Sequence, residues 1–475
     1  MDGSRISHKK ILGPFALAMI AVAAIIDLRG LPMMASYGFG VIFVYGVAAL
    51  MFLIPSGLVC AELSTHIKQP GGMYVWIRSA FGDKAGFLSI WLEWLNNVIG
   101  FPASLSFISV TLSYLINPAL AQNKVLVLIS TLTILWSVTF FTMLGVKASS
   151  RLNMLGALLG TMIPALIIIA LSVTWVLLGK PLQVDVSWSS VIPSFKNSNP
   201  GFFAAIILGF GGMQIVAFHT VNVRDPNRTF PLAILSAVLI IVAVALFTSL
   251  AIAVVVPHQQ LNLISGLIDG FSRFFQAFQM SWATPVIVLM IILSMLATLN
   301  AWFLGPARGL AVAAQNGFLP KTLAKLNRKE MPGHILLLQA IVGTLLSTIF
   351  LYMPDISSAF WILLNLSSQS ALLVYILIFA SAIKRRYMPT TETLTGFRIP
   401  FGNVGIWIVA GVGIITCVIA LMASVIPPGL VKTGSIWRYE GILLLSNLIF
   451  LSVPFFIISY YTYQNHRNSL SVSQS

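Results

Sequence analysis

The sequence predicts an all-α protein that crosses a lipid bilayer many times. Hydrophobic residues make up 58% of the 475-residue chain and charged residues 8%, whereas soluble domains carry about 25% charged residues. Apolar runs of about 18 residues or more, long enough to cross a bilayer as helices, recur along the whole chain. Two of these runs contain glycine-rich interruptions, which lipid tolerates only where the freed backbone is buried in protein or lines a cavity.

Twelve apolar runs are long enough to be membrane-spanning helices. They lie near residues 13–36, 40–63, 86–114, 125–145, 153–178, 202–222, 230–256, 281–312, 335–353, 358–383, 404–425 and 441–463. No other stretch is long or polar enough for a soluble domain, so one transmembrane domain is expected over residues 1–475. The longest connections, near 179–200, 257–280 and 384–403, are expected to be loops.

Basic residues gather in every second connection between the expected spans. If both termini are cytoplasmic, 20 of the 27 Lys and Arg residues lie on the cytoplasmic side, 6 lie outside, and Arg29 lies within the membrane. Cytoplasmic loops carry an excess of Lys and Arg, so this orientation is expected. The same clusters explain the formal net charge of +15 without a nucleic-acid partner.

The first span contains a polar interruption. Asp27 and Arg29 are ionisable, and Gly30, Leu31 and Pro32 follow directly. Ionisable side chains at membrane depth are costly and often mark a transport pathway. We therefore expect Arg29, Gly30, Leu31 and Pro32 to contact a substrate. The alternative is a proline kink with a packing glycine.

The sixth span contains a second interruption, at Phe210, Gly211, Gly212 and Gln214. Interrupted spans at positions one and six are typical of a five-plus-five inverted repeat, in which two broken helices meet at mid-membrane. Half-helix N-termini there can hold a carboxylate, and unwound carbonyls can accept hydrogen bonds from an ammonium group. An amino acid zwitterion suits such a site.

The proposed repeat gives the domain its internal boundaries. The first repeat covers about residues 11–180 and the second about 200–386. Helices eleven and twelve, about 403–463, lie outside the repeat, and residues 464–475 form a short cytoplasmic tail.

Three ionisable residues are candidates for a charge role as well as for a structural one. Asp27 is either the partner of Arg29 in a structural ion pair or a counter-charge and proton site beside a substrate. Glu93 in the third span and His219 in the sixth are candidate proton or ion sites. Each of these two could instead be a packed, hydrogen-bonded group.

Polar and aromatic residues of the later spans complete the candidate site. Thr298 and Trp302 lie four residues apart and share a helix face. Phe210 and Trp302 are candidate gate aromatics. Tyr375 follows a polar stretch of the tenth span and is placed on the opposite wall.

Motifs of enzymes and of ATP-driven proteins do not occur in this sequence. It has no P-loop, no Cys/His metal spacing, no Gly-x-Ser-x-Gly and no dinucleotide fingerprint. We therefore expect neither an enzyme nor a bound cofactor or metal, and transport would draw on a gradient or on exchange.

Several short motifs recur from the first span to the loop after the eighth. They are Pro32 to Phe39, Ile54 to Leu58, Ala61 to Leu63, Gly71-Gly72, Gly211 to Gln214 through His219, Arg224 to Pro231, Trp302 with Gly305 to Gly309, and Asn316-Gly317. In these motifs, and over nearly its whole length, the chain resembles the amino acid–polyamine–organocation superfamily, and most of all its bacterial glutamate/GABA antiporter branch. The resemblance implies a leucine-transporter-type fold and exchange of amino acids across a bacterial inner membrane.

The chain departs from the antiporter pattern at the expected site. Gln214 and Thr298 stand where the antiporters have glutamates, and Arg29 lies in a break that carries an acid there. Trp94 falls near a tyrosine position in the third span, and Tyr375 falls near one in the tenth. Losing two acids and gaining a base is a large electrostatic change in a low-dielectric cavity.

These observations favour an amino acid exchanger of the bacterial inner membrane that works by alternating access. Its partners would be an amino acid and the lipid bilayer, with the protein a monomer or homodimer. The alternative is a proton- or sodium-coupled amino acid symporter. Lesser alternatives are glutamate/GABA antiport itself and an amino acid sensor that does not transport.

Overall fold

The computed structural model describes residues 13–67, 72–145, 156–192, 200–216, 223, 226–388, 396–429, 431–432 and 435–472. The first helices are α1 (Pro14–Ile25), α2 (Leu31–Ala35), α3 (Val41–Ala48), α4 (Ile54–His66), α5 (Met73–Phe81), α6 (Asp83–Ser113) and α7 (Lys124–Met143). They are followed by α9 (Ile163–Leu177), α10 (Trp188–Val191), α11 (Phe203–Gly209), α12 (Met213–Val216), α13 (Pro226–Val255) and α14 (Gly266–Ala277). The last are α15 (Thr284–Gln315), α16 (Gly333–Ser347), α17 (Ile349–Tyr352), α18 (Ile356–Arg386), α19 (Gly402–Ala423) and α20 (Ile436–Val472). Helices make up all the regular structure described, and no strand is among them.

Ten of the described helices are long and apolar enough to cross a membrane, or eleven if the bent pair α1 and α2 is one span. They coincide with the expected spans except the sixth, where the described chain contains only the short helices α11 and α12. Two connections expected to be loops contain helical turns, since α10 lies in 179–200 and α14 in 257–280. The multi-span helical architecture is thus confirmed, while the count of twelve stays a prediction.

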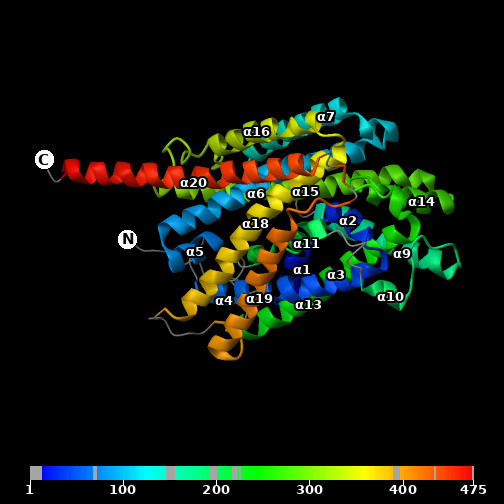
Figure 1. Cartoon of the computed structure of the whole chain (residues 1–475), viewed down its shortest axis with the longest axis horizontal. Helices are drawn as coiled ribbons and strands as arrows, with labels where there is room; N and C mark the ends of the chain where they lie inside the picture. Colours follow the sequence, from blue (N-terminus) through cyan, green and yellow to red (C-terminus); the bar gives the residue numbers. More distant parts are fainter. Residues whose placement is uncertain are drawn as a thin grey trace.

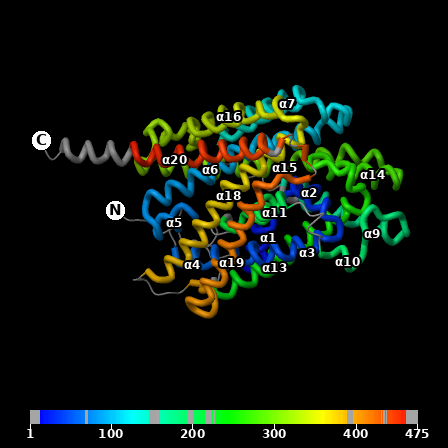
Figure 2. The backbone as a smooth tube through the Cα atoms, in the orientation of Figure 1, coloured from blue at the N-terminus to red at the C-terminus, as the bar shows by residue number. Residues whose placement is uncertain are grey.

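Helices α6 and α18 form the centre of the molecule. Their most apolar stretches are 83% and 78% buried, whereas the corresponding stretch of α20 is only 17% buried. Figure 1 shows α7 and α16 along one edge of the view and α13 and α19 along the opposite edge, with α6 and α18 between them. In Figure 2 the tube places α9, α10 and α14 at one end and α5 at the other.

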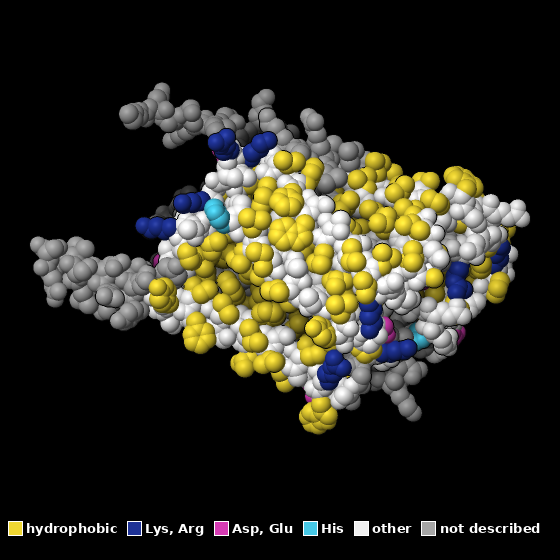
Figure 3. All heavy atoms as spheres, turned by 90° about the horizontal axis from the view of Figure 1, so that it is seen from above, with side chains coloured by type: hydrophobic (Ala, Val, Ile, Leu, Met, Phe, Trp, Pro, Cys, Tyr) yellow, Lys and Arg dark blue, Asp and Glu magenta, His cyan; other side chains and the backbone are white. Residues whose placement is uncertain are grey.

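The surface carries the charge distribution of a membrane protein. In Figure 3 a broad area of hydrophobic side chains separates groups of Lys and Arg side chains near the two ends of the molecule. α13 also carries large exposed hydrophobic residues, such as Leu235, Leu239 and Phe247. Lipid tails can cover them, so their exposure here carries no cost of contact with water.

The first span is broken at the end of α1, and the chain becomes helical again within a few residues. Ile26 and Asp27 are extended, so the helical hydrogen-bond ladder of α1 stops there, and α2 continues at an angle of 52°. Asp27 caps the short 3₁₀ turn Leu28–Gly30 by accepting the N–H of Arg29 at 3.0 Å. Pro32 lies in the first turn of α2, where its missing N–H costs nothing.

The second break packs directly against the first. α11 ends at Gly209, and Gly212 has φ 135°, a conformation that side-chain-bearing residues rarely adopt. A Cβ atom added to Gly212 would lie 2.9 Å from Cγ1 of Ile25, at the end of α1. The two interruptions therefore meet in space, as the sequence predicts.

Candidate substrate cavity

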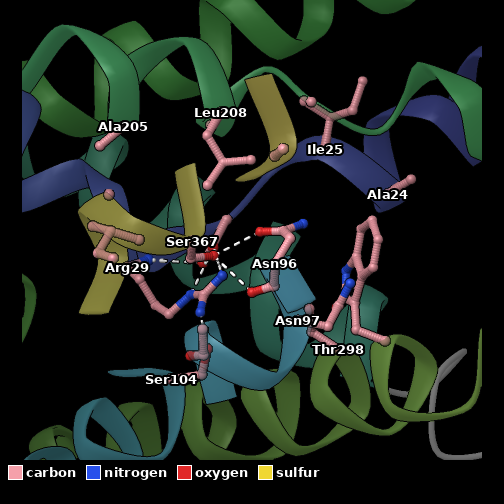
Figure 4. Close-up of a pocket in the computed structure, with 18 of the residues that line it drawn as sticks. Ala24, Ile25, Arg29, Asn96, Asn97, Ser104, Ala205, Leu208, Thr298 and Ser367 are labelled. Carbon is pink, nitrogen blue, oxygen red and sulfur yellow. Dashed lines mark hydrogen bonds and ion pairs between the residues drawn. The ribbon is translucent and has the colours of Figure 1, made fainter. Parts of the chain in front are cut away.

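A cavity of about 160 Å³ lies where the two broken segments meet α6, α15 and α18. From the two breaks its walls include Ala23 to Asp27, Arg29, Gly30, Met33, Ala205, Leu208, Gly209, Gly211 and Gln214. The three long helices add Glu93, Asn96, Asn97, Gly100, Phe101, Ser104, Met295, Thr298, Leu299, Trp302, Leu364, Ser367, Ala371 and Tyr375. Figure 4 shows Arg29, Ser104, Ser367 and Asn96 gathered in its interior.

Arg29 and Asp27 form an ion pair at the cavity. Arg29 Nε donates to Asp27 Oδ2 at 2.6 Å, and Nη2 donates to the same oxygen. Nη1 donates to the hydroxyl of Ser104 on α6 (Figure 4). The side chains are only 22% and 26% exposed, so the pair is partly withdrawn from solvent. It ties the first break to the third span.

Glu93 contributes a carboxylate to the cavity wall. The residue is 6% exposed, and its side chain makes no ion pair or hydrogen bond with the described residues. An unpaired carboxylate in a low-dielectric site either stays protonated or attracts a cationic group. Glu93 therefore presents a carboxyl group without a partner among the described residues to the cavity.

Gln214, Tyr375 and Gly212 form a hydrogen-bonded chain beside the second break. The Tyr375 hydroxyl donates to Gln214 Oε1 at 2.6 Å and accepts the N–H of Gly212 at 2.7 Å. The Tyr375 ring packs edge-on against Phe52 with centroids 4.8 Å apart. α18 thus fixes the backbone of the break through one phenol group.

Thr298 and Trp302 both line the cavity from α15, as their spacing predicts. Asn300, between them, lies away from it, where its Oδ1 accepts the hydroxyl of Thr142 at 3.2 Å. The two breaks, α6, α15 and α18 thus all carry predicted residues to one cavity.

Five predicted site residues are not among those that line the cavity: Leu31, Pro32, Trp94, Phe210 and Gly212. Leu31 is buried in the core, and Pro32 packs against Gly266. Trp94 is buried beside Trp91, and the ring of Phe210 lies 5.4 Å from that of Tyr45. These four residues pack behind the two breaks and the cavity walls. The N–H of Gly212 donates to the hydroxyl of Tyr375, which does line the cavity. His219 lies outside the described residues.

Several polar wall residues were not singled out from the sequence. Asn96, Asn97, Gly100 and Ser104 line the cavity together with Glu93. Glu93, Asn97, Gly100 and Ser104 follow one another at intervals of four, three and four residues, and Asn96 adjoins Asn97, so all five lie on one face of α6. That periodicity of small and polar residues within an apolar span is the signal that could have identified them.

The wall of α18 is joined to that of α6. The Ser367 hydroxyl shares its one hydrogen between the backbone oxygen of Asn96, at 2.9 Å, and the Oδ1 of Asn96, at 2.6 Å (Figure 4). A Cβ atom added to Gly100 would lie 3.0 Å from the Ser367 hydroxyl oxygen, so the glycine allows close packing here.

The chain matches known transporters over nearly its full length. It is 41% identical over 449 residues to an uncharacterized transporter of Legionella pneumophila, covering 94% of this chain and 96% of that protein. It is 27% identical over 465 residues to the glutamate/gamma-aminobutyrate antiporter of Lactococcus lactis, covering 97% and 92%. It is also 25% identical to a probable agmatine/putrescine antiporter of that species, covering 83% of each chain. The amino acid permease model matches residues 12–446, and the chain therefore belongs to the amino acid permease family and is a transporter, not an enzyme.

Proposed function

We propose that this permease exchanges amino acids across a bacterial inner membrane by alternating access, as a twelve-helix, leucine-transporter-type protein with both termini cytoplasmic. The observation that carries the proposal is the cavity at the meeting point of the two broken segments. Membrane transporters bind substrate and coupling ions at such midplane breaks. Bacterial relatives with antiporter names support exchange and the bacterial membrane.

The cavity supports an amino acid better than a large ligand. Its volume of about 160 Å³ is that of a small metabolite, and backbone from both breaks lines it. Backbone N–H groups at half-helix N-termini would hold the carboxylate, while carbonyls of the first break and Glu93 would face the ammonium group. Three of the five side-chain N–H groups of Arg29 already have partners, which favours a supporting role for Arg29 over direct substrate contact.

Counterflow in proteoliposomes tests the exchange. Vesicles preloaded with one unlabelled amino acid at a time should take up its labelled form faster than empty vesicles do. Because an exchanger returns loaded, empty vesicles should show little net uptake. Equal uptake with and without every internal amino acid would contradict exchange.

A proton-coupled symporter is the second candidate, favoured by the unpaired carboxylate of Glu93 in the cavity wall. It predicts that an inwardly directed proton gradient drives uptake into empty vesicles. Glu93→Gln should then abolish gradient-driven uptake while counterflow persists, because glutamine carries no proton across. Loss of both activities in a stably folded Glu93→Gln variant would instead assign Glu93 to substrate binding.

A further inference from the structure

A second, smaller cavity lies between the ends of α4 and α18, away from the substrate cavity. It measures about 40 Å³, and its charged and ionisable lining consists of Glu62, His66, Arg385, Arg386 and Arg398. No residue in the described part of the chain lines both cavities. One water molecule needs roughly 10–15 Å³ of such space, so the cavity has room for a few atoms of that size, as in a phosphoryl group.

Arg386 has unused donors in this cavity. Its side chain is 2% exposed, and Nη2 donates to Glu62 Oε2 at 2.8 Å and to the Ile399 carbonyl at 3.3 Å. Nε and Nη1 are buried without a hydrogen-bond partner. Because buried donors are nearly always paired, these two nitrogens indicate an acceptor at this place.

The surrounding charge decides what kind of acceptor fits. Among the described residues, Glu62 is the single acid lining the cavity, and Arg386 already neutralises it. Arg385 and Arg398 also line the cavity and form no ion pair with any described residue. The surplus is therefore positive. Water could accept hydrogen bonds from the free donors of Arg386, but it would not balance the excess positive charge. An anion would accept these hydrogen bonds and balance the charge.

We propose that this cavity binds a phosphate group, supplied by an anionic phospholipid headgroup or by free phosphate. Guanidinium groups match the geometry of phosphate oxygens, and three of them converge here. α4 and α18 belong to candidate membrane spans, and both end at this cavity. We therefore expect the cavity to lie at the depth of lipid headgroups. The C-terminal ends of α4 and α18 carry partial negative charges, which repel an anion. This repulsion is weaker than the attraction of the arginines, because each arginine carries a full positive charge.

Phosphate binding should stabilise a junction of three chain segments. Glu62 Oε2 accepts the Ile399 N–H at 2.7 Å, and the Thr65 hydroxyl donates to the Phe397 carbonyl at 3.3 Å. The cavity thus joins α4, α18 and the segment leading into α19. A ligand on Arg385, Arg386 and Arg398 would add contacts to all three.

Thermal unfolding of the full-length protein in an uncharged detergent tests the proposal. The ligands are phosphatidylglycerol, phosphatidylcholine and inorganic phosphate, with chloride at equal ionic strength as the reference. The variant Arg385→Gln/Arg398→Gln leaves the Arg386–Glu62 pair intact, so its unfolding temperature without ligand should match the native one. The control Lys325→Gln/Arg328→Gln removes the same charge from exposed residues elsewhere.

The native protein and the control should be stabilised by phosphatidylglycerol, and the Arg385→Gln/Arg398→Gln variant should need at least about tenfold more ligand for the same shift, because two charged hydrogen bonds are lost. A shift with phosphatidylglycerol alone assigns the site to a lipid headgroup, and an equal shift with inorganic phosphate assigns it to the free ion. Identical shifts in all three proteins, or no shift with any phosphate-bearing ligand, would overturn the proposal.

Discussion

Arg29 lies within the membrane-embedded part of the chain, and each of its side-chain nitrogens has a partner. Nε and Nη2 donate to Asp27, and Nη1 donates to Ser104. The sequence predicted that Arg29 contacts the substrate, with a structural ion pair between Asp27 and Arg29 as the alternative. The geometry favours a pair that holds the first break against α6.

A double variant distinguishes the two roles. Arg29→Gln alone leaves the Asp27 carboxylate without its partner, and should destabilise the protein by about 1–3 kcal/mol, less than the 3–5 kcal/mol of a fully buried pair. Asp27→Asn/Arg29→Gln removes both charges and should restore much of the stability and transport. Thermal unfolding and counterflow measure these effects. Transport that stays absent in a well-folded double variant would assign Arg29 to substrate binding.

The ion pair between Arg78 and Asp83 provides the matched control. It is also an arginine–aspartate pair, but its side chains are 46% and 60% exposed. Exposed pairs contribute at most about 1 kcal/mol, so Arg78→Gln should change stability little. If Arg78→Gln loses as much stability as Arg29→Gln, the withdrawal of the Asp27–Arg29 pair from solvent does not explain its contribution to stability.

At the level of elements, the breaks were predictable and the cavity wall was only partly so. The second break depends on the backbone freedom of Gly212, so the sequence there was sufficient. The first helix instead stops at the extended residues Ile26 and Asp27, upstream of Gly30 and Pro32, which are themselves helical. Whether a side chain lines the cavity depends on the packing of neighbouring helices. Trp94 therefore turned out to be buried beside Trp91, while Ser104 on the same helix reaches Arg29.

Gly212 is the position at which the second break depends most on a single residue. Gly212→Ala would force an L-residue into φ 135° and bring its Cβ atom within 2.9 Å of Ile25. We expect a loss of roughly 1–3 kcal/mol of stability from the backbone strain, with weaker substrate binding because Tyr375 bonds this N–H. Thermal unfolding with and without substrate measures both.

Gly209 offers a control within the same segment. A Cβ atom there would meet nothing within 4 Å, and Gly209 ends α11, where alanine favours the helix by about 0.5–1 kcal/mol. Gly209→Ala should therefore keep or raise the unfolding temperature. If Gly209→Ala and Gly212→Ala lose the same stability, the loss in Gly212→Ala does not come from the positive φ of Gly212.

At the scale of the whole molecule, the positions of the helix ends predict that the chain crosses the membrane between α10 and α13. The backbone N–H of Gln183 donates to the Val254 carbonyl at 2.9 Å, so the C-terminal end of α13 lies beside the segment before α10. α13 is itself a spanning helix, and its first turn, with Arg228, must lie at the opposite end. If the chain from α11 onward crosses the membrane, the start of α13 comes to lie on the side opposite α10. This crossing would also give an even number of spans, which places both termini on one side.

Cysteine labelling in intact cells tests both the crossing and the orientation. Asp185, Arg228 and Lys329 are exposed, whereas the native Cys60 and Cys417 are buried, so background labelling should be low. A membrane-impermeant maleimide should label Asp185→Cys from outside, and should label Arg228→Cys and Lys329→Cys only after permeabilisation. External labelling of both Asp185→Cys and Arg228→Cys would show that the broken segment does not cross. A full reversal of the pattern would instead place the basic clusters outside, against the charge rule that predicts cytoplasmic termini.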